Sequence, residues 1–383
     1  MQHERRKTGG IVMNRFIILL LAFVLILSGC NTDSGESASE TKETSGVETT
    51  SGETTELLDT SDPLDTTEAQ TTTEAVDTTA ETTEVQITTT PETTEEAVTT
   101  PTPLPEPIPG TISDAISAIS AANAFVYNVN SDELLAKKGD GLNFSPASIT
   151  KLLTALYALE TAPSDLVISP KAEELSLVGK NSSIAYIKTH HKLTVSQLIQ
   201  GMMMPSGNDA AYALAAGVGR HIAGDQSMNG KDAVSLFVKG LNEYAIKIGC
   251  TGTHFTVPDG LAGSEHYTSS HDMIIIGKLA VNNPIIAKYS KTVSQKVYYA
   301  SGHSITWNNT NSLINPNSEY YSPYVNGLKT GSLSGNYCLY VSAVINENTY
   351  LIGIFGAPTK SGRYDDAHIL IDAILETVKE AGE

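Results

Sequence analysis

The chain divides into three stretches that differ in the pattern of their hydrophobic and polar positions. Residues 16–27 form an unbroken apolar run, residues 31–109 show almost no apolar periodicity, and helical and strand patterns alternate from about residue 110 onward. A segment without periodic apolar positions cannot bury enough surface to order itself. We therefore predict an export segment at 1–30, a disordered tether at 31–109 and a folded domain at 110–383.

The third stretch predicts a mixed α/β domain. Apolar residues at Ile149, Leu152, Leu153, Leu156 and Leu159 form one helical stripe. Further helices are expected over "TVSQLIQGMMMPSGNDAAYALAAGV" with a break at Pro205, "AVSLFVKGLNEYAIKIG" ending near Gly249, "SSHDMIIIGKLAV" capped by Ser270, and "YDDAHILIDAILETVKEA". The segment "GNYCLYVSAVINENTYLIGIFGA" predicts two strands around a turn. Central helices with paired strands late in the chain favour an antiparallel sheet.

Charge is concentrated in the predicted tether. The chain carries a net charge of −19, and residues 31–109 hold 19 acidic residues against one basic residue, Lys42. Repulsion and low hydrophobicity favour a flexible coil there, which would span roughly 50 Å. The remaining chain is only mildly acidic and has no basic stripe, so nucleic acid is not an expected partner.

The N-terminus resembles a lipoprotein export signal. Basic residues precede the apolar run Phe16–Leu27, which is far shorter than the ~20 residues that span a bilayer. The run ends in "LSGC", which resembles a lipobox with Cys30 as the lipidated residue. An ordinary signal peptide with an incidental cysteine is the alternative. Cys250 and Cys338 remain in the domain; Cys338 lies in a strand-like run and is interpreted as a buried free thiol, while a bond between the two stays open.

Three short motifs suggest chemistry when they are taken together. They are Ser148-Ile-Thr-Lys151, Ser206-Gly-Asn208 and Lys329-Thr330-Gly331. Taken alone, Ser148 would be a helix cap and Lys329 a surface charge. In context, Ser148 begins a helix with Lys151 one turn later, Ser206 follows the helix break, and Lys329 precedes a strand whose edge can pair with a peptide.

The motifs and their flanks resemble the serine D-Ala-D-Ala carboxypeptidases, the low-molecular-weight penicillin-binding proteins of peptidase family S11. "SPASITKLLTALYALE", "GMMMPSGNDAAYALAA", "THFTVPDGL", "NGLKTGS", "HYTSSHDMIIIGKLA" and "GAPTKSGRYDDAHILID" stand in family order across 121–383. The loop "SLSGNYC" departs from the pattern, because it is about one residue shorter and lacks a common acidic residue. The resemblance implies a β-lactamase/transpeptidase-like α/β fold, with an antiparallel five-stranded sheet flanked by helices and a mainly helical subdomain.

The resemblance also implies roles. Ser148 would be the nucleophile and Lys151 its base, with a pKa lowered by burial and by the Lys329 cation. Ser206 would relay a proton, and Asn208 would hold Lys151 and the substrate amide. The remaining residues would bind the substrate. Lys329 and Thr330 would bind its terminal carboxylate, and Gly331 would let the strand come close to the ligand. The N–H groups of Ser332 and Ser148 would form the oxyanion hole. No cofactor or metal is expected, and His190–His191 is interpreted as an exposed pair outside any metal site.

The function implied is removal of the terminal D-Ala from peptidoglycan stem peptides outside the cytoplasmic membrane, by a lipid-anchored enzyme that β-lactam antibiotics would inhibit covalently. Three alternatives stay open. A D,D-endopeptidase would use the same residues. A serine β-lactamase would need a Glu followed three residues later by Leu-Asn, a motif that is absent after Asn208. A non-catalytic cell-wall-binding lipoprotein would not need the intact motifs.

Overall fold

The computed structural model describes residues 110–382. The predicted export segment, the Cys30 lipidation site and the predicted tether lie outside the described residues. Within 110–382, no helix combines the length and the apolar character that a bilayer-spanning helix needs.

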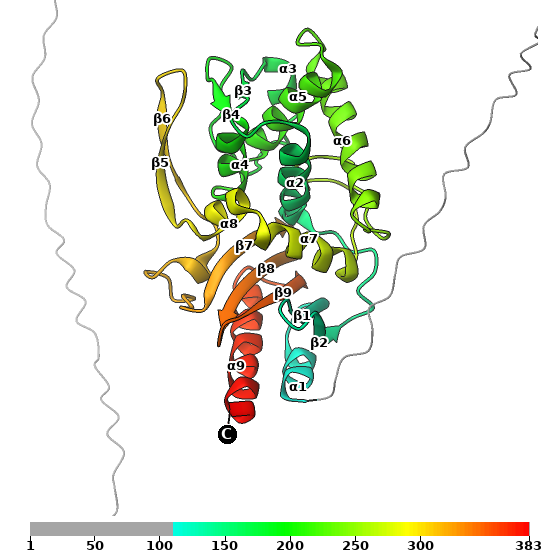
Figure 1. Ribbon diagram of the computed structural model, residues 1–383, viewed down its shortest axis with the longest axis vertical. Helices are drawn as coiled ribbons and strands as arrows, with labels where there is room; N and C mark the ends of the chain where they lie inside the picture. The colour runs from blue at the N-terminus through cyan, green and yellow to red at the C-terminus, as the bar shows by residue number, and fades with distance from the viewer. Residues whose placement is uncertain (1–109, 383) are drawn as a thin grey trace, which may run out of the picture. The chain divides into compact units, whose positions relative to one another are not determined.

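The domain is built on a five-stranded sheet in the order β2-β1-β9-β8-β7, and every neighbouring pair is antiparallel (Figure 1). The strands are β1 Asn123–Asn128, β2 Glu133–Lys138, β7 Val325–Leu333, β8 Asn336–Ile345 and β9 Asn348–Ala357. Strands β8 and β9 are buried on both faces, so they carry continuous apolar runs instead of alternation. This arrangement confirms the predicted fold class, and β7 forms one edge of the sheet.

Helices cover both faces of the sheet and create two cores. Helices α1 (Thr111–Ala118) and α9 (Gly362–Gly382) pack against one face, and the larger helical region lies on the other (Figure 1). The latter contains α2 Lys151–Thr161, α3 Ala172–Leu175, α4 Val195–Met203, α5 Asn208–Ala223, α6 Gly230–Lys247, α7 Ser270–Asn282, α8 Pro284–Lys291, and the short strands β3 Val167–Ile168 and β4 Leu193–Thr194. The predicted break at Pro205 separates α4 from α5.

Helix ends follow local hydrogen-bonding rules. The Thr194 side chain accepts a hydrogen bond from the Gln197 N–H, and the Gln197 side-chain oxygen accepts one from the Thr194 N–H. These two bonds form a capping box that starts α4. The cap of α7 is Ser269, which accepts the Asp272 N–H, so the expectation of Ser270 was off by one residue. Helix α6 ends before Gly249, whose φ of +96° suits a residue without a Cβ.

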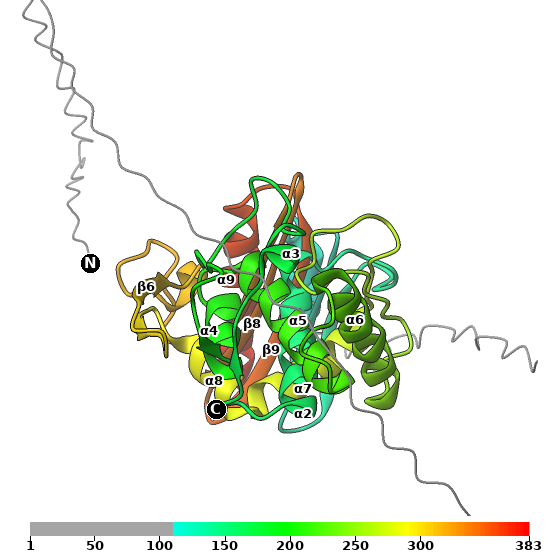
Figure 2. The ribbon, with the colours of Figure 1, turned by 90° about the horizontal axis from the view of Figure 1, so that it is seen from above.

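A separate two-stranded hairpin, β5 Ser294–Tyr298 and β6 Ser304–Asn308, stands beside the helical region (Figure 2). Its turn packs against the segment that precedes β4, where the Ala300 N–H donates to the Lys192 carbonyl. The expectation of an exposed pair at His190–His191 is wrong for His191, because this hairpin covers it: His191 is 7% exposed. Cys250 and Cys338 are both free thiols and both buried, as expected for Cys338.

Candidate active site

Ser148 and Lys151 meet where a 3₁₀ turn, Ala147–Thr150, runs directly into α2. The turn begins at Ala147, whose φ of +50° is rare for a residue with a Cβ and marks a strained backbone that the surroundings hold in place. One turn of helix then sets the two side chains on the same face, and Lys151 Nζ lies 2.9 Å from Ser148 Oγ. Ser148 is half-buried and Lys151 is fully buried.

The surroundings of Lys151 direct the lone pair of a neutral amine. Its Nζ also lies 2.8 Å from Asn208 Oδ1 and 2.8 Å from the Asp259 carbonyl oxygen. An amide oxygen and a carbonyl oxygen only accept hydrogen bonds, so they take two N–H groups of the amine. The Ser148 hydroxyl is the one partner among the three that can donate. A neutral Lys151 is therefore arranged to receive the proton of Ser148.

Burial favours that neutral form. Removal from water lowers the pKa of Lys151 from 10.5 to about 8, although the charges of Asp259 and Asp209 oppose this change. The sequence interpretation gave burial and the Lys329 cation as joint causes; burial is what lowers the pKa of Lys151, and Lys329 is not among the charges that shift it. About a tenth of Lys151 is then uncharged at pH 7, far more than at its ordinary pKa, and the neutral form is the one that a general base requires.

Ser206 and Lys329 form a second pair beside the first. Ser206 lies in the break between α4 and α5 with a φ of +61°, and Lys329 Nζ donates to its Oγ at 2.9 Å. Lys329 lies inside β7, so the expectation that it precedes the strand is wrong, and so is the surface-charge interpretation, because it is 1% exposed. Burial, then the charges of Lys151 and Arg363, lowers the pKa of Lys329 well below its ordinary value.

Strand β7 places the rest of the third motif along the cleft. The Thr330 hydroxyl lies 2.7 Å from that of Thr310, and the exposed Ser332 borders the cleft. Gly331 is needed for packing: a Cβ there would lie 2.9 Å from the Pro146 carbonyl oxygen and 3.0 Å from Ala147 Cβ. The close approach that Gly331 permits is therefore to the turn that carries Ser148, where the sequence interpretation had expected an approach to ligand.

Two adjoining cavities open at Ser148. One of about 360 Å³ is bordered by Ser148, Asn208, Ser332 and Tyr337. The other, of about 220 Å³, is bordered by Ser148, Ser206, Thr330, Ser332 and Arg363. The Ser148 hydroxyl thus lies where one ligand can extend in two directions, into the cavity bordered by Tyr337 and into the cavity bordered by Ser206.

Arg363 is a site residue that the sequence interpretation did not assign, although "GAPTKSGRYDDAHILID" was recognised as a family-like segment. It is 2% exposed and comes from the start of α9. Its Nη1 donates to the Gly331 carbonyl at 2.8 Å and lies 3.0 Å from Ser332 Oγ. Nothing local marks an arginine as buried, so only the packing of α9 against β8 and β9, which brings Arg363 to the backbone of Gly331, reveals this second basic group beside Lys329.

The fold and this cluster define an α/β enzyme-like domain of the serine penicillin-binding type. The profile of the D-alanyl-D-alanine carboxypeptidase family, peptidase S11, matches residues 110–359, and the chain belongs to this family. The family resemblance seen in the sequence is thereby confirmed.

Curated relatives of this chain also carry the name D-alanyl-D-alanine carboxypeptidase. The chain is 30% identical over 252 residues to D-alanyl-D-alanine carboxypeptidase DacF of Bacillus subtilis, covering 64% of this chain and 58% of that protein. It is 30% identical over 261 residues to the D-alanyl-D-alanine carboxypeptidase of Streptomyces sp. strain K15, covering 65% and 85% respectively. The match thus spans less than two thirds of the Bacillus relative.

Solved structures of similar fold include the Streptomyces K15 DD-transpeptidase, with a TM-score of 0.59, 26% identity, and coverage of 70% of this chain and 98% of that one. A D-alanyl-D-alanine carboxypeptidase from Mycobacterium tuberculosis H37Rv has a TM-score of 0.56 at 25% identity, with coverage of 71% and 94%. These neighbours share the fold found here.

Proposed function

We propose that this chain is a serine D-Ala-D-Ala carboxypeptidase that removes the terminal D-Ala of peptidoglycan stem peptides through an acyl-enzyme on Ser148. The observation that carries the proposal is the buried Lys151 amine, 2.9 Å from the Ser148 hydroxyl, with its other two contacts occupied by pure acceptors. A serine hydroxyl is a weak nucleophile without a base, and this amine supplies one.

Acylation follows from the contacts of the site. Ser148 Oγ attacks the carbonyl carbon of the penultimate D-Ala and passes its proton to neutral Lys151. The tetrahedral oxyanion is stabilised by the backbone N–H groups of Ser148 and Ser332; removing one such donor typically costs about 3–4 kcal/mol. The departing amine of the terminal D-Ala takes, through Ser206, the proton that Lys151 accepted, which returns Lys151 to its neutral form; Ser206 Oγ also contacts Lys329.

Substrate selection rests on the cations beside Ser206. Lys329 and Thr330 bind the terminal carboxylate, and Arg363 contributes positive charge from behind Gly331 and Ser332. The carboxylate offsets the repulsion among these cations, so a ligand with a free terminal carboxylate is favoured. Water then hydrolyses the ester, with Lys151 again able to accept and return the proton, and the products are the shortened peptide and D-Ala.

The experiment that tests this function is the release of D-Ala from a soluble pentapeptide ending in D-Ala-D-Ala, together with intact-mass measurement after penicillin treatment. We expect catalytic D-Ala release and a long-lived penicilloyl adduct, both lost in Ser148→Ala. Rapid return to the unmodified mass with many penicillins consumed would identify a β-lactamase. Cleavage of cross-linked dimers without D-Ala release would identify an endopeptidase, and no covalent adduct would identify a wall-binding protein.

We also propose that the enzyme acts outside the cytoplasmic membrane, held by a lipid on Cys30 and separated from it by the 31–109 tether. The support is the "LSGC" sequence after a short apolar run and the acidic, non-periodic composition that follows. Cys30→Ala should move the protein from the membrane fraction to the soluble fraction with D-Ala release unchanged. Full retention of Cys30→Ala in the membrane fraction would contradict lipid anchoring.

A further inference from the structure

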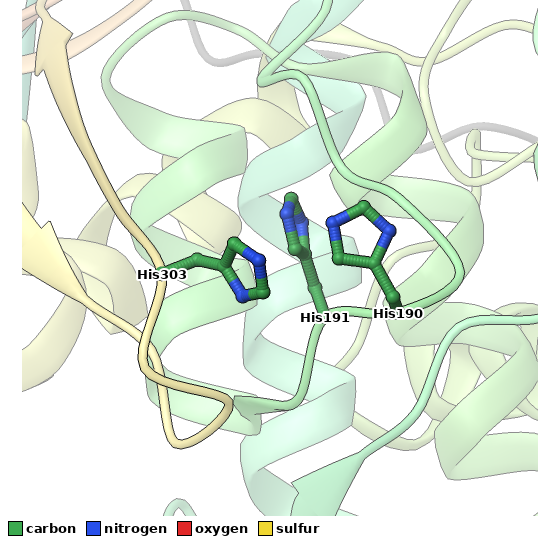
Figure 3. Close-up of side chains that lie close together, drawn as sticks. All are labelled: His190, His191 and His303. Atoms are coloured by element: carbon green, nitrogen blue, oxygen red, sulfur yellow. The ribbon is translucent and has the colours of Figure 1, made fainter.

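Three histidines gather on a face of the molecule that the chemistry of Ser148 does not use. His190 and His191 precede β4, and His303 lies in the turn between β5 and β6. Figure 3 shows the three rings gathered together, and because the His190 and His303 centroids lie only 4.7 Å apart, the rings form a triangle. The ring centroids of His191 lie 4.5 Å from His190 and 5.0 Å from His303, and one nitrogen from each of the three lies within 4.8 Å of the others.

The two chain segments are joined by bonds that do not involve imidazoles. The Ala300 N–H donates to the Lys192 carbonyl at 3.1 Å, and the Lys192 N–H donates to Ser301 Oγ at 3.2 Å. Within the hairpin turn, the Tyr299 N–H donates to the His303 carbonyl at 2.8 Å. The backbone therefore brings the three histidines together before any ligand is considered, which lowers the ordering cost of a shared ligand.

Neighbouring groups already orient two of the rings. His303 Nδ1 lies 3.2 Å from Ser301 Oγ, which leaves its Nε2 free. His191 is buried, and its Nδ1 accepts the Lys188 N–H at 3.1 Å. A hydrogen bond at the second ring nitrogen commonly orients metal-binding histidines, and the Ser301 contact can do this for His303, whereas the Lys188 contact holds the His191 ring with Nδ1 as an acceptor. His190 and His303 are exposed and can rotate to close on an ion.

We propose that His190, His191 and His303 bind a zinc ion, with water as the fourth ligand. Three imidazoles without a carboxylate suit a borderline cation such as Zn²⁺ and do not suit Ca²⁺ or Mg²⁺, which prefer oxygen. Zinc–nitrogen bonds of about 2.0–2.1 Å place tetrahedral ligand atoms roughly 3.3 Å apart. The two exposed rings therefore move inward by about an ångström or somewhat more.

His191 sets the strength of the site. While its Nδ1 accepts the Lys188 N–H, neutral His191 carries its proton on Nε2. Zinc binds either Nδ1, in place of the Lys188 N–H, or Nε2, after the ring proton moves from Nε2 to Nδ1. Both routes break the hydrogen bond from the Lys188 N–H and cost affinity. We therefore expect micromolar binding, weaker than that of closed structural zinc sites.

The ion would act as a clamp between the hairpin and the wall of the cleft. Trp307 of β6 donates from Nε1 to the Ala185 carbonyl at 3.0 Å, and the Ala185 N–H donates to Asp209 Oδ1 at 2.7 Å. Asp209 follows Asn208, which contacts Lys151. Zinc at the histidines would thus fix the hairpin over the segment that borders the cleft, while taking no part in the reaction itself.

Equilibrium dialysis of the untagged full chain against micromolar Zn²⁺, followed by metal analysis, tests the proposal. We expect one zinc per chain, and at least tenfold weaker binding in both His190→Gln and His303→Gln. His221→Gln is the matched control, because His221 is an exposed histidine of α5 outside the cluster, and it should bind zinc as the unaltered chain does. Co²⁺ in place of zinc should give the intense visible absorption of a tetrahedral site.

A second readout guards against misfolded variants. Zinc should raise the Tm of the unaltered chain and of His221→Gln but not of His303→Gln, whose Tm without zinc should match theirs. No stoichiometric zinc at micromolar concentration overturns the site. So does stoichiometric zinc that survives His303→Gln, which would place the ion elsewhere. Neither result bears on the release of D-Ala, so this proposal and the proposed function can fail separately.

Discussion

Two groups of charged side chains are buried in this domain, and they are built on opposite principles. Arg220 of α5 and Glu174 of α3 form a bidentate ion pair, with Nη1–Oε1 at 3.0 Å and Nη2–Oε2 at 2.9 Å. Arg220 Nε also donates to the Met228 carbonyl, and Glu174 accepts the Lys171 N–H. The hydrogen bonds of this pair are made to an opposite charge or to a backbone group, so each buried charge has a partner.

The Lys151–Lys329 pair instead brings two amines into the interior that would repel each other if both were charged. Burial lowers the pKa of both amines, and the pKa of Lys329 is lowered further by Lys151 and Arg363. Burying two amines side by side opposes folding. It also leaves an uncharged amine at Ser148 and a basic pocket that can bind an anion. The first pair serves the fold, and we infer that the second gives up stability for reactivity.

The largest expected effect is the loss of activity when Lys151, a member of the second group, is replaced. Lys151→Ala should reduce kcat/KM for D-Ala release by roughly 10³–10⁴-fold, because Ser148 loses its only base. The free energy of unfolding of this variant should fall much less than the activation barrier rises, because the substitution also removes an amine that is unfavourable to bury. D-Ala release and urea unfolding measure the two quantities. Activity within tenfold of the unaltered chain would show that another group accepts the Ser148 proton.

Arg220→Met should have the reverse profile. It leaves the Glu174 carboxylate buried without its partner, which typically costs about 3–5 kcal/mol of stability. At a temperature where the variant is folded, kcat/KM should stay close to that of the unaltered chain. The double variant Arg220→Met with Glu174→Met is the matched control and should recover much of the lost stability. A stable single variant would contradict a structural role for the pair.

Lys329→Met tests whether the Lys151–Lys329 pair lowers the stability of the domain. The variant should be at least as stable as the unaltered chain in urea, because it removes a buried amine whose charged form is disfavoured by burial and by the nearby Lys151 and Arg363. Its kcat/KM should fall about hundredfold, since the substrate carboxylate loses its cation. A loss of several kcal/mol of stability would show that Lys329 holds the cleft together and would weaken the proposed trade of stability for reactivity.

The pH dependence gives the smallest expected effect. Lys151 accepts a proton only when neutral, so kcat/KM should rise with pH to a plateau above about 8 and lie about tenfold lower at pH 7. The same pKa, lowered from 10.5, means that the unfolded chain binds a proton that the folded chain does not between about pH 8 and 10.5. Lys151 therefore contributes stability that increases with pH across that window. A flat kcat/KM between pH 6 and 9 would exclude Lys151 as the titrating base.

Much of the first motif could be predicted from the chain alone. A spacing of three residues at a helix start places Ser148 and Lys151 on one face whatever the rest of the fold does. The Pro205 break, the late β8–β9 hairpin and the resemblance across 121–383 similarly predicted the fold class. The hairpin β5–β6 was not predicted, because its alternation is weak and both strands are largely exposed.

What the sequence by itself determined is the identity and local spacing of the reactive groups, because helix and turn geometry acts over a few residues. The tertiary structure alone decided which further distant groups meet them: the Asp259 carbonyl at Lys151, Arg363 behind β7, and His303 against His191. It also decided their charge states, since a pKa depends on burial and on neighbours from other elements. Lys329 looks like a solvated lysine in the chain and becomes a buried amine only when β7 takes its place at the edge of the sheet.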